Sequence, residues 1–464
     1  MENQMVGRKL YPLTSAQLLN FMSWQYTIHK QIMNVPTSFF VDAPLDLDLL
    51  KRSVEESIQR NDSFGIRVTR QGKEILQYFT DRKALLLETL DFTGKTNEEM
   101  EKFFFRIARK AIPLYDQPLA KIYIVKTPDG MCGIFSCICH LMMDTWAITL
   151  FYRDVVAIYM AHLNNTPMPD PIRSFEPVIQ KELDYRASDR HKKDLEFWRQ
   201  EILSYGTAPT FTHINGTHKL DKYRKIIRKP NYPFAINVAL RSTASHEVLM
   251  VEKEDVDNMC RFCTEQNVPT MQLLFFLGMR TYLAKVNRTN DVSVANVIAR
   301  RATLEEKLSG GTRPLAIFCR TVMQDDTTFM EALKTVMEKQ NTEFRHANTN
   351  TVEVIALMHD EFEMKAYEGY CSTYLTFQPL PMNVGYDLKV RSQWYCNGTG
   401  AMSVYLTIMD ANSTGALRCY YEYLDKSIKP ETIRKCHKYM IKVIRAGISN
   451  PDISMKELLE IPIS

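Results

Sequence analysis

The sequence lacks a strong excess of charge of either sign: 58 Lys and Arg stand against 54 Asp and Glu, a formal net charge of +4 over 464 residues. A nucleic-acid partner requires a dense positive field, so this balance argues against one. Internal repeats, heptad arrays and low-complexity stretches are missing too, which sets aside solenoids and coiled coils. What remains is a globular composition with 45% hydrophobic and 24% charged residues. The length predicts about three domains or two large ones.

The ten cysteines form no regular framework of spacings, and the N-terminus lacks the apolar core of a signal peptide. We therefore expect free thiols and a cytoplasmic location. Cys260 and Cys263 form a CxxC, but with Val256 and Met259 they follow the i, i+3, i+4, i+7 period of one apolar helix face. Because no second CxxC and no nearby histidine completes a tetrahedral site, we interpret both thiols as core residues and expect no metal.

One apolar run, Cys132 to Tyr152, is about as long as a membrane span. His140 and Asp144 lie at its centre, where an ionisable group would cost several kcal/mol in lipid. We interpret the run as a buried strand, a short loop and a buried helix, and we expect no membrane span.

A proline-rich linker is predicted at Asn164 to Ser174 (NNTPMPDPIRS), which divides the chain into domains 1–174 and 175–464. Both parts mix the periodicities of strands and helices, which predicts two α/β lobes. Strands are expected at 38–41, 121–126, 133–139, 291–299 and 402–409, and helices at 47–59, 97–111, 253–266, 271–286 and 430–446.

The segment CICHLMMDTW, from Cys137 to Trp146, places three apolar residues between a histidine and an aspartate. Helical periodicity follows, so Asp144 or Thr145 lies where a helix N-cap is expected. On the simpler interpretation Asp144 is only this cap, and His140 is a half-buried residue. On the alternative, His140 presents an imidazole of pKa ~6.5 to a cavity and exchanges a proton near neutral pH. Asp144 would then orient the loop and pair with an arginine.

Six segments resemble, in order, the motifs of the condensation domains of nonribosomal peptide synthetases, within the chloramphenicol acetyltransferase-like superfamily. They are Tyr11 to Met22 (YPLTSAQLLNFM), Arg60 to Arg67 (RNDSFGIR), Cys139 to Trp146 (CHLMMDTW), Asp184 to Trp198, Gly311 to Arg320 (GTRPLAIFCR) and Tyr420 to Ile461. The third is similar to H-H-x3-D-G-W and keeps His140, Asp144 and Trp146. Six segments in the right order are far more specific than any one of them.

Four positions depart from the family motifs. Cys139 replaces the first histidine of the third motif, Thr145 its glycine, Gly65 an arginine of the second motif and Leu315 an asparagine of the fifth. A β-branched Thr145 restricts the close backbone approach that glycine permits. Gly65 removes the expected ion-pair partner of Asp144. Because a buried unpaired aspartate is costly, Arg67 or another arginine is expected to replace that partner.

The resemblance implies two chloramphenicol acetyltransferase-like lobes, each a mixed sheet flanked by helices, arranged in a V around a central tunnel that contains His140. It implies an amide bond between a carrier-bound acyl or aminoacyl thioester and a free or carrier-bound amine. His140 would position the amine or accept its proton, while Asp144 would fix the loop. No cofactor would be tightly bound, because the substrates arrive as phosphopantetheine thioesters. The candidate tunnel residues are Cys139, Thr145, Trp146, Tyr374 and Gln378.

Little chain remains outside the six motifs, and we find no serine motif for phosphopantetheine attachment. We therefore expect a free-standing monomer that receives its substrate from a separate carrier protein. Carrier proteins are usually acidic, so the basic segment Lys219 to Lys229 (KLDKYRKIIRK) is either a docking surface or an ordinary solvated segment. Two other functions stay open: O-acylation of an alcohol, and a non-catalytic docking module, which the residues Cys139, Thr145 and Gly65 suggest.

Overall fold

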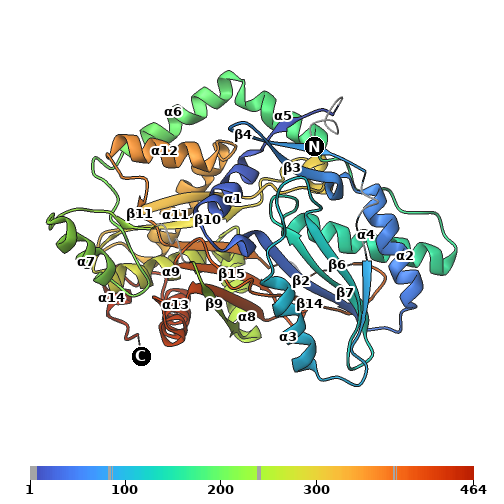
Figure 1. Cartoon of the computed structure of the whole chain (residues 1–464). Coiled ribbons are helices and arrows are strands. Elements are labelled where there is room, and N and C mark those ends of the chain that lie inside the picture. Colours follow the sequence, from blue (N-terminus) through green and yellow to red (C-terminus); the bar gives the residue numbers. More distant parts are fainter. Residues whose placement is uncertain are drawn as a thin grey trace. The chain divides into compact units, whose positions relative to one another are not determined.

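The computed structural model describes residues 8–81, 85, 87–237, 242–379, 382 and 384–463 (Figure 1). The chain forms two compact units, and each unit combines segments that are far apart in the sequence. Unit 1 comprises Met1–His191, Ala299–Pro314 and Met382–Gly398, and unit 2 comprises Lys192–Ile298, Leu315–Pro381 and Thr399–Ser464. This division differs from a single cut after residue 174. The V and the tunnel depend on how one unit is placed against the other, so they stay predictions.

The larger sheet of unit 1 has five strands in the described residues, in the order β14-β2-β7-β6-β5. The strands are β14 (Val390–Trp394), β2 (Asn34–Val41), β7 (Cys132–Cys139), β6 (Ala120–Lys126) and β5 (Leu87–Asp91). β5 and β6 are parallel and the other neighbours antiparallel, so the sheet is mixed. A smaller sheet contains β1 (Tyr11–Pro12), β4 (Glu74–Phe79) and β3 (Ile66–Gln71). Because β14 pairs with β2, the segment after residue 381 returns to this unit.

Helices cover both faces of the five-stranded sheet (Figure 1). The helices of this unit are α1 (Ser15–Tyr26), α2 (Leu47–Arg60), α3 (Asn97–Ala108), α4 (Thr145–Asn164), α5 (Glu176–Arg186) and α10 (Leu304–Leu308). On the α3 face, Phe104 stacks on Phe135 of β7 with ring centroids 4.1 Å apart. On the other face, Tyr152 of α4 stacks on Phe39 of β2.

The apolar run from residue 132 to residue 152 is a strand, a loop and the start of α4, as predicted. All eight residues of β7 are buried, because the strand is covered on both faces. This double burial explains why the run resembles a membrane span in composition. Throughout the described part of the chain, no helix is long and apolar enough to cross a membrane.

Gly133 of β7 lies opposite Phe40 of β2, and the two backbones approach closely there. A Cβ atom at this position would lie 2.1 Å from the carbonyl oxygen of Phe39. Gly133→Ala is therefore expected to lower the free energy of unfolding by about 1–3 kcal/mol, measured by urea denaturation. Gly400→Ala is the control, because its Cβ would meet its nearest neighbour, Ala244, at an ordinary 3.4 Å. Equal stability of the two variants would contradict the close approach.

The sheet of unit 2 has six strands in the described residues, in the order β11-β10-β13-β15-β16-β9. The strands are β11 (Leu315–Val322), β10 (Asp291–Ile298), β13 (Thr373–Gln378), β15 (Val404–Asp410), β16 (Leu417–Leu424) and β9 (Ala244–Val251). β13 is parallel to both of its neighbours, and the remaining pairs are antiparallel. A short pair joins β8 (Ala235–Ile236) and β12 (Glu368–Gly369). Both units are therefore mixed α/β structures, as predicted.

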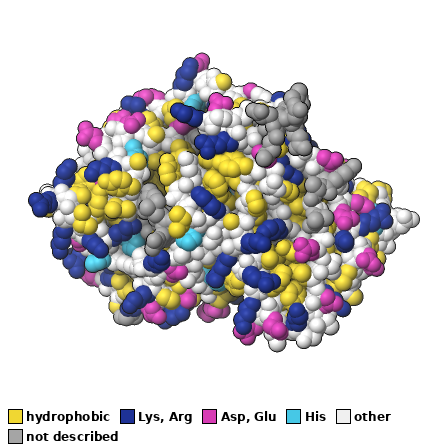
Figure 2. Space-filling view, viewed as in Figure 1, with side chains coloured by type: hydrophobic (Ala, Val, Ile, Leu, Met, Phe, Trp, Pro, Cys, Tyr) yellow, Lys and Arg dark blue, Asp and Glu magenta, His cyan; other side chains and the backbone are white. Residues whose placement is uncertain are grey.

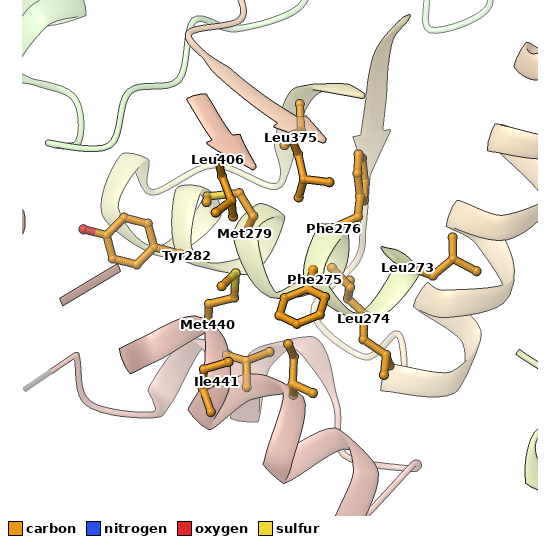
Figure 3. Packing of buried hydrophobic residues seen from close by; sticks show 14 of the residues in the cluster. Leu273, Leu274, Phe275, Phe276, Met279, Tyr282, Leu375, Leu406, Met440 and Ile441 are labelled. Atoms are coloured by element: carbon orange, nitrogen blue, oxygen red, sulfur yellow. The ribbon is translucent and has the colours of Figure 1, made fainter. Parts of the chain in front are cut away.

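The core of unit 2 surrounds one helix, α9 (Gln272–Asn287), which packs between the sheet and α13 (Pro430–Ser449) (Figure 3). Leu273, Phe276 and Met279 of α9 belong to the same buried cluster as Leu375 of β13 and Met440 of α13. The other helices of this unit are α6 (Asp189–Leu203), which starts within unit 1, α7 (His218–Ile227), α8 (Lys253–Glu265), α11 (Phe329–Arg345), α12 (Thr351–Glu361) and α14 (Met455–Glu460).

The CxxC lies on α8, as its period predicts, but only one thiol is in the core. Cys263 is buried, whereas Cys260 is exposed and its sulfur lies 3.7 Å from the sulfur of Met271. The prediction that Cys260 packs in the core is therefore wrong. The buried stripe of this helix continues through Phe262 instead. Within the described residues, no three His, Cys, Asp or Glu side chains form a group that could hold a metal ion.

Candidate active site

The loop between β7 and α4 contains both residues of the H-x3-D motif. Asp144 is the N-cap of α4, and its Oδ1 accepts a hydrogen bond of 2.8 Å from the backbone N–H of Ala147. His140 follows the last residue of β7, and its backbone N–H donates to the carbonyl oxygen of Met33 at 2.7 Å. The strand end and the helix start thus hold the two residues at defined positions.

The carboxylate of Asp144 is buried and faces an arginine from the segment 299–314. Arg301 donates through one guanidinium nitrogen to Oδ1 at 3.0 Å and to Oδ2 at 2.9 Å. The two side chains are only 1% and 2% exposed. Oδ2 also accepts from the backbone N–H of Arg313 at 3.1 Å. Because these partners occupy both oxygens, Asp144 positions the loop and is not placed to act as a base.

The predicted ion-pair candidate Arg67 does not have this role, which is a correction. Its guanidinium donates to the carbonyl oxygens of Phe64 at 3.0 Å and Ile66 at 2.8 Å. Arg67 lies on β3 and bonds back to its own strand and the turn before it, whereas Arg301 is brought to Asp144 by a segment 157 positions further along the chain. The local motif that suggested Arg67 contains no information about that segment.

The imidazole of His140 contacts side chains from two other elements, both through Nδ1. The amide nitrogen of Asn20, on α1, lies 3.4 Å from Nδ1, and Oγ1 of Thr312 lies 3.3 Å from it. The ring is half-buried, and burial lowers its pKa below the usual value of 6.5. The lowered pKa therefore favours the neutral imidazole at pH 7. No hydrogen bond of Nε2 is found within the described residues.

Gln17, from the first motif, is hydrogen-bonded to the same loop. Its amide nitrogen donates to the carbonyl oxygen of Leu141 at 3.0 Å and to the side-chain oxygen of Gln77 at 2.7 Å. The side chain is fully buried, so the pair satisfies polar groups that have no access to water. The first motif therefore contributes to the position of His140 through hydrogen bonds.

Three predicted tunnel residues lie next to this loop in unit 1. Cys139 is buried at the end of β7, and burial raises the pKa of its thiol to about 12, so the thiol stays protonated. Thr145 is the first residue of α4 and is partly exposed. Trp146 is 37% exposed, and its indole nitrogen donates to the carbonyl oxygen of Lys307 at 2.8 Å. Trp146 is thereby turned toward α10.

The other two predicted tunnel residues, Tyr374 and Gln378, lie on β13 in unit 2. Tyr374 makes edge contacts with the rings of Phe318 and Tyr405, at centroid distances of 6.0 and 5.7 Å. Burial raises the pKa of its hydroxyl. Gln378 is the last residue of the strand and is partly exposed. Their contact with a substrate stays a prediction.

The basic segment from residue 219 to residue 229 includes α7 and the residues after it. The exposed cations are Lys222, Lys225, Arg228 and Lys229. Figure 2 shows Lys and Arg side chains around the part of the surface where α7 lies. Lys219 differs from them, because its ammonium lies 5.2 Å from the ring centre of Phe211. The role of the segment from residue 219 to residue 229 in docking stays a prediction.

Sequence reasoning did not single out Asn20, Arg301 or Thr312. Asn20 lies within the first predicted motif and Thr312 within the fifth, so the motifs indicated their neighbourhoods. Arg301 lies in none of the predicted motifs, and its only notable neighbour in the sequence is Arg300. The assembled site can hold a neutral imidazole beside a reacting group and move one proton there.

The family model described as Condensation domain matches residues 7–462. The chain is similar to a plipastatin synthase protein of Bacillus subtilis (strain 168), with 21% identity over 452 residues, and to surfactin synthase subunit 1 of the same organism, with 22% identity over 459 residues. Both alignments cover 97% of this chain, which spans only 17% and 12% of the lengths of those relatives.

Solved structures show the same fold at low identity. The first condensation domain of the calcium-dependent antibiotic synthetase, in complex with substrate analogue 3a, is similar with a TM-score of 0.80 and 15% identity, over 97% of this chain and 98% of that one. A mutant starter condensation domain of rhizomide synthetase, in complex with C8-CoA and Leu-SNAC, is similar with a TM-score of 0.81 and 12% identity, over 98% of both chains. The fold is thus the two-lobe, chloramphenicol acetyltransferase-like one. With a family match along nearly its whole length and His140 at the end of β7, this chain belongs to the condensation-domain family.

Proposed function

We propose that this chain forms an amide bond between an acyl or aminoacyl group, carried as a thioester, and an amine acceptor. The observation that carries the proposal is His140, held half-buried at the end of β7 with Nδ1 beside Asn20 and Thr312, in a member of the condensation-domain family. The rhizomide synthetase domain of similar fold is in complex with C8-CoA and Leu-SNAC. That pair of thioesters supports the same substrate class here.

In the proposed reaction the amine nitrogen attacks the thioester carbonyl carbon. The new C–N bond forms, the C–S bond breaks, and the sulfur leaves as a thiolate that takes up a proton. Amide formation from a thioester is downhill, so we propose that no ATP and no tightly bound cofactor take part. Alignment of the two reactants supplies several kcal/mol of barrier reduction, and the remaining task is the proton on the attacking nitrogen.

His140 has two possible roles in this step, and the hydrogen on Nδ1 distinguishes them. If Nδ1 donates to Thr312, Nε2 carries the lone pair and accepts the proton of the amine. If Nδ1 accepts from Asn20, Nε2 carries the hydrogen and stabilises the oxyanion of the tetrahedral intermediate. Both roles need the neutral ring that burial favours.

The proposal includes the partners that the family resemblance implies. The donor thioester arrives on phosphopantetheine of a carrier protein, and the amine is either free or carrier-bound. The protein acts as a monomer in the cytoplasm. The exposed cations Lys222, Lys225, Arg228 and Lys229 form a candidate surface for an acidic carrier.

The test incubates the full chain with an acyl N-acetylcysteamine thioester and a panel of amines and matched alcohols. Products are identified by mass spectrometry, with heat-denatured protein as the background for uncatalysed aminolysis. Amide products above this background support the proposal. Ester products without amides would replace it with O-acylation of an alcohol. Absence of turnover on every pair, together with tight binding of a phosphopantetheinylated carrier protein, would replace it with a docking function.

The rate of amide formation is expected to depend on pH through His140. Burial lowers the pKa of this imidazole below 6.5, so the neutral ring predominates above pH 6.5 and the charged ring forms as the pH decreases through the lowered pKa. At a constant concentration of free-base amine, kcat/KM should be level from about pH 7.5 to 8.5 and should reach half of this level only below pH 6.5. Initial rates across this range measure the profile. An apparent pKa above 7 on the acidic limb would contradict a buried neutral His140.

A further inference from the structure

A pocket within unit 2 lies between α6, β11 and the helices α11 and α12, and it shares no residue with the His140 site. The centres of water-sized groups can occupy about 40 Å³ of it, and about 620 Å³ are empty when the open mouth is included. This space exceeds the roughly 10–15 Å³ that one water requires. Apolar side chains form most of the wall: Trp198, Ile202, Ile317, Phe318, Val354 and Met358.

The polar end of the pocket is Glu343 of α11, which is 1% exposed. Its Oε1 lies 3.1 Å from the ammonium of Lys339. Its Oε2 is buried and has no hydrogen-bond partner in the described part of the chain, apart from the weak donor thiol of Cys319 beside this carboxyl. A buried carboxylate oxygen without a strong donor is costly, so Oε2 has the capacity to bind one.

The charges around the pocket do not balance within the protein. The ammonium of Lys339 is shared between Glu343 and Glu201. Arg320 also lines the pocket, but its guanidinium pairs with both oxygens of Asp291 at 2.8 Å. Two carboxylates therefore share one cation when both are ionised. One further positive charge would balance the second carboxylate.

We propose that this pocket binds a small organic cation, a primary alkylammonium, with its ammonium on Oε2 of Glu343 and its alkyl chain against the apolar wall. An ammonium supplies the strong donors and the positive charge that Oε2 lacks. The neighbouring wall of Trp198, Val354 and Met358 suits a short hydrocarbon chain. The site is independent of the proposed function, because it uses other residues and other chemistry.

Binding is expected to depend on pH through Glu343. The titratable groups that face this carboxyl are Lys339 on its own helix, Glu201 on α6, Tyr205 just after α6, Cys319 and Arg320 on β11, and Tyr370. Burial raises the pKa of Glu343 to about 7. An alkylammonium stays charged up to pH 8, and it binds the ionised carboxylate. The affinity for the cation is therefore expected to increase by up to about tenfold between pH 6 and pH 8.

The experiment titrates the full chain with n-butylammonium chloride by isothermal titration calorimetry at pH 6 and pH 8, with 1-butanol as the uncharged probe. Saturable binding of the cation is expected, tighter at pH 8, and butanol should bind at least tenfold more weakly. Glu343→Gln should weaken cation binding at least tenfold. Glu338→Gln is the matched control, because Glu338 is exposed on the same helix. Its affinity should equal that of the unmodified chain.

A second variant keeps the carboxylate and fills the space. Ala347 is 7% exposed and lines the pocket, so Ala347→Leu should also weaken binding at least tenfold. If circular dichroism shows that Glu343→Gln does not fold, Ala347→Leu tests the proposal in its place. The proposal is overturned if the unmodified chain shows no saturable binding, if butanol binds as tightly as butylammonium, or if either pocket variant that folds retains full affinity.

Discussion

Replacing His140 by alanine is expected to lower kcat/KM for amide formation by a factor of about 10²–10⁴, the usual contribution of a side chain that handles a proton in the transition state. Its place at the end of β7 is defined by backbone bonds, so the loop should keep its course without the imidazole. The measurement is the initial rate with an acyl thioester and the best amine from the panel. KM should change far less than kcat, because the ring acts on the reacting atoms.

One further variant and one further measurement make this result interpretable. His218→Ala removes an exposed histidine at the start of α7 and should leave the rate unchanged. Urea denaturation of His140→Ala should give a free energy of unfolding within about 1 kcal/mol of the unmodified chain, which separates lost chemistry from lost folding. If the alanine variant formed product at the normal rate, His140 would not be the catalytic residue.

Replacing Arg301 by methionine is expected to lower the free energy of unfolding by about 3–5 kcal/mol, because Asp144 would remain buried without its cation. The guanidinium also donates to the carbonyl oxygens of Ser309 and Gly311, both at 2.9 Å, so its loss leaves these oxygens unpaired as well. Urea denaturation measures the change. The activity should fall at the same time, because Asp144 holds the loop that contains His140.

The control is Arg391→Met, which breaks an exposed ion pair with Asp129 at 2.7 Å and should cost less than about 1 kcal/mol. Arg301→Met combined with Asp144→Asn should recover part of the loss, because the uncompensated charge is then removed. A loss below about 1 kcal/mol for Arg301→Met, or no recovery in the double variant, would show that the cost does not arise from the unpaired carboxylate.

Local patterns predicted the elements of the fold well. The strand at 133–139 and the helix at 253–266 correspond to β7 and α8, because each depends on the order of apolar and polar residues within a short window. The burial of individual side chains was predicted less well. Cys260 lies at the edge of the apolar stripe of α8, and the elements packed against the helix leave it exposed.

The division into units could not be predicted from a linker. Most of the proline-rich stretch, from residue 165 to residue 174, lies outside helices and named strands, yet the chain stays in unit 1 until His191. β14 then returns from residue 390 to pair with β2. Strand pairing depends on which edge is free in the folded unit, and a sequence window contains no record of that edge.

The residues of the candidate site also fall into two groups: those that the sequence indicated and those that only the structure identified. The sequence by itself indicated His140 as the candidate for handling a proton, placed a helix N-cap at Asp144 or Thr145, and predicted membership of the family, because short motifs, capping and motif order are local properties of the chain. Only the tertiary structure decided that Arg301 neutralises Asp144, and that Asn20 and Thr312 contact His140. Hydrogen bonds and ion pairs depend on distances in space, and residues more than a hundred positions apart reach those distances only after the sheet and its helices have packed.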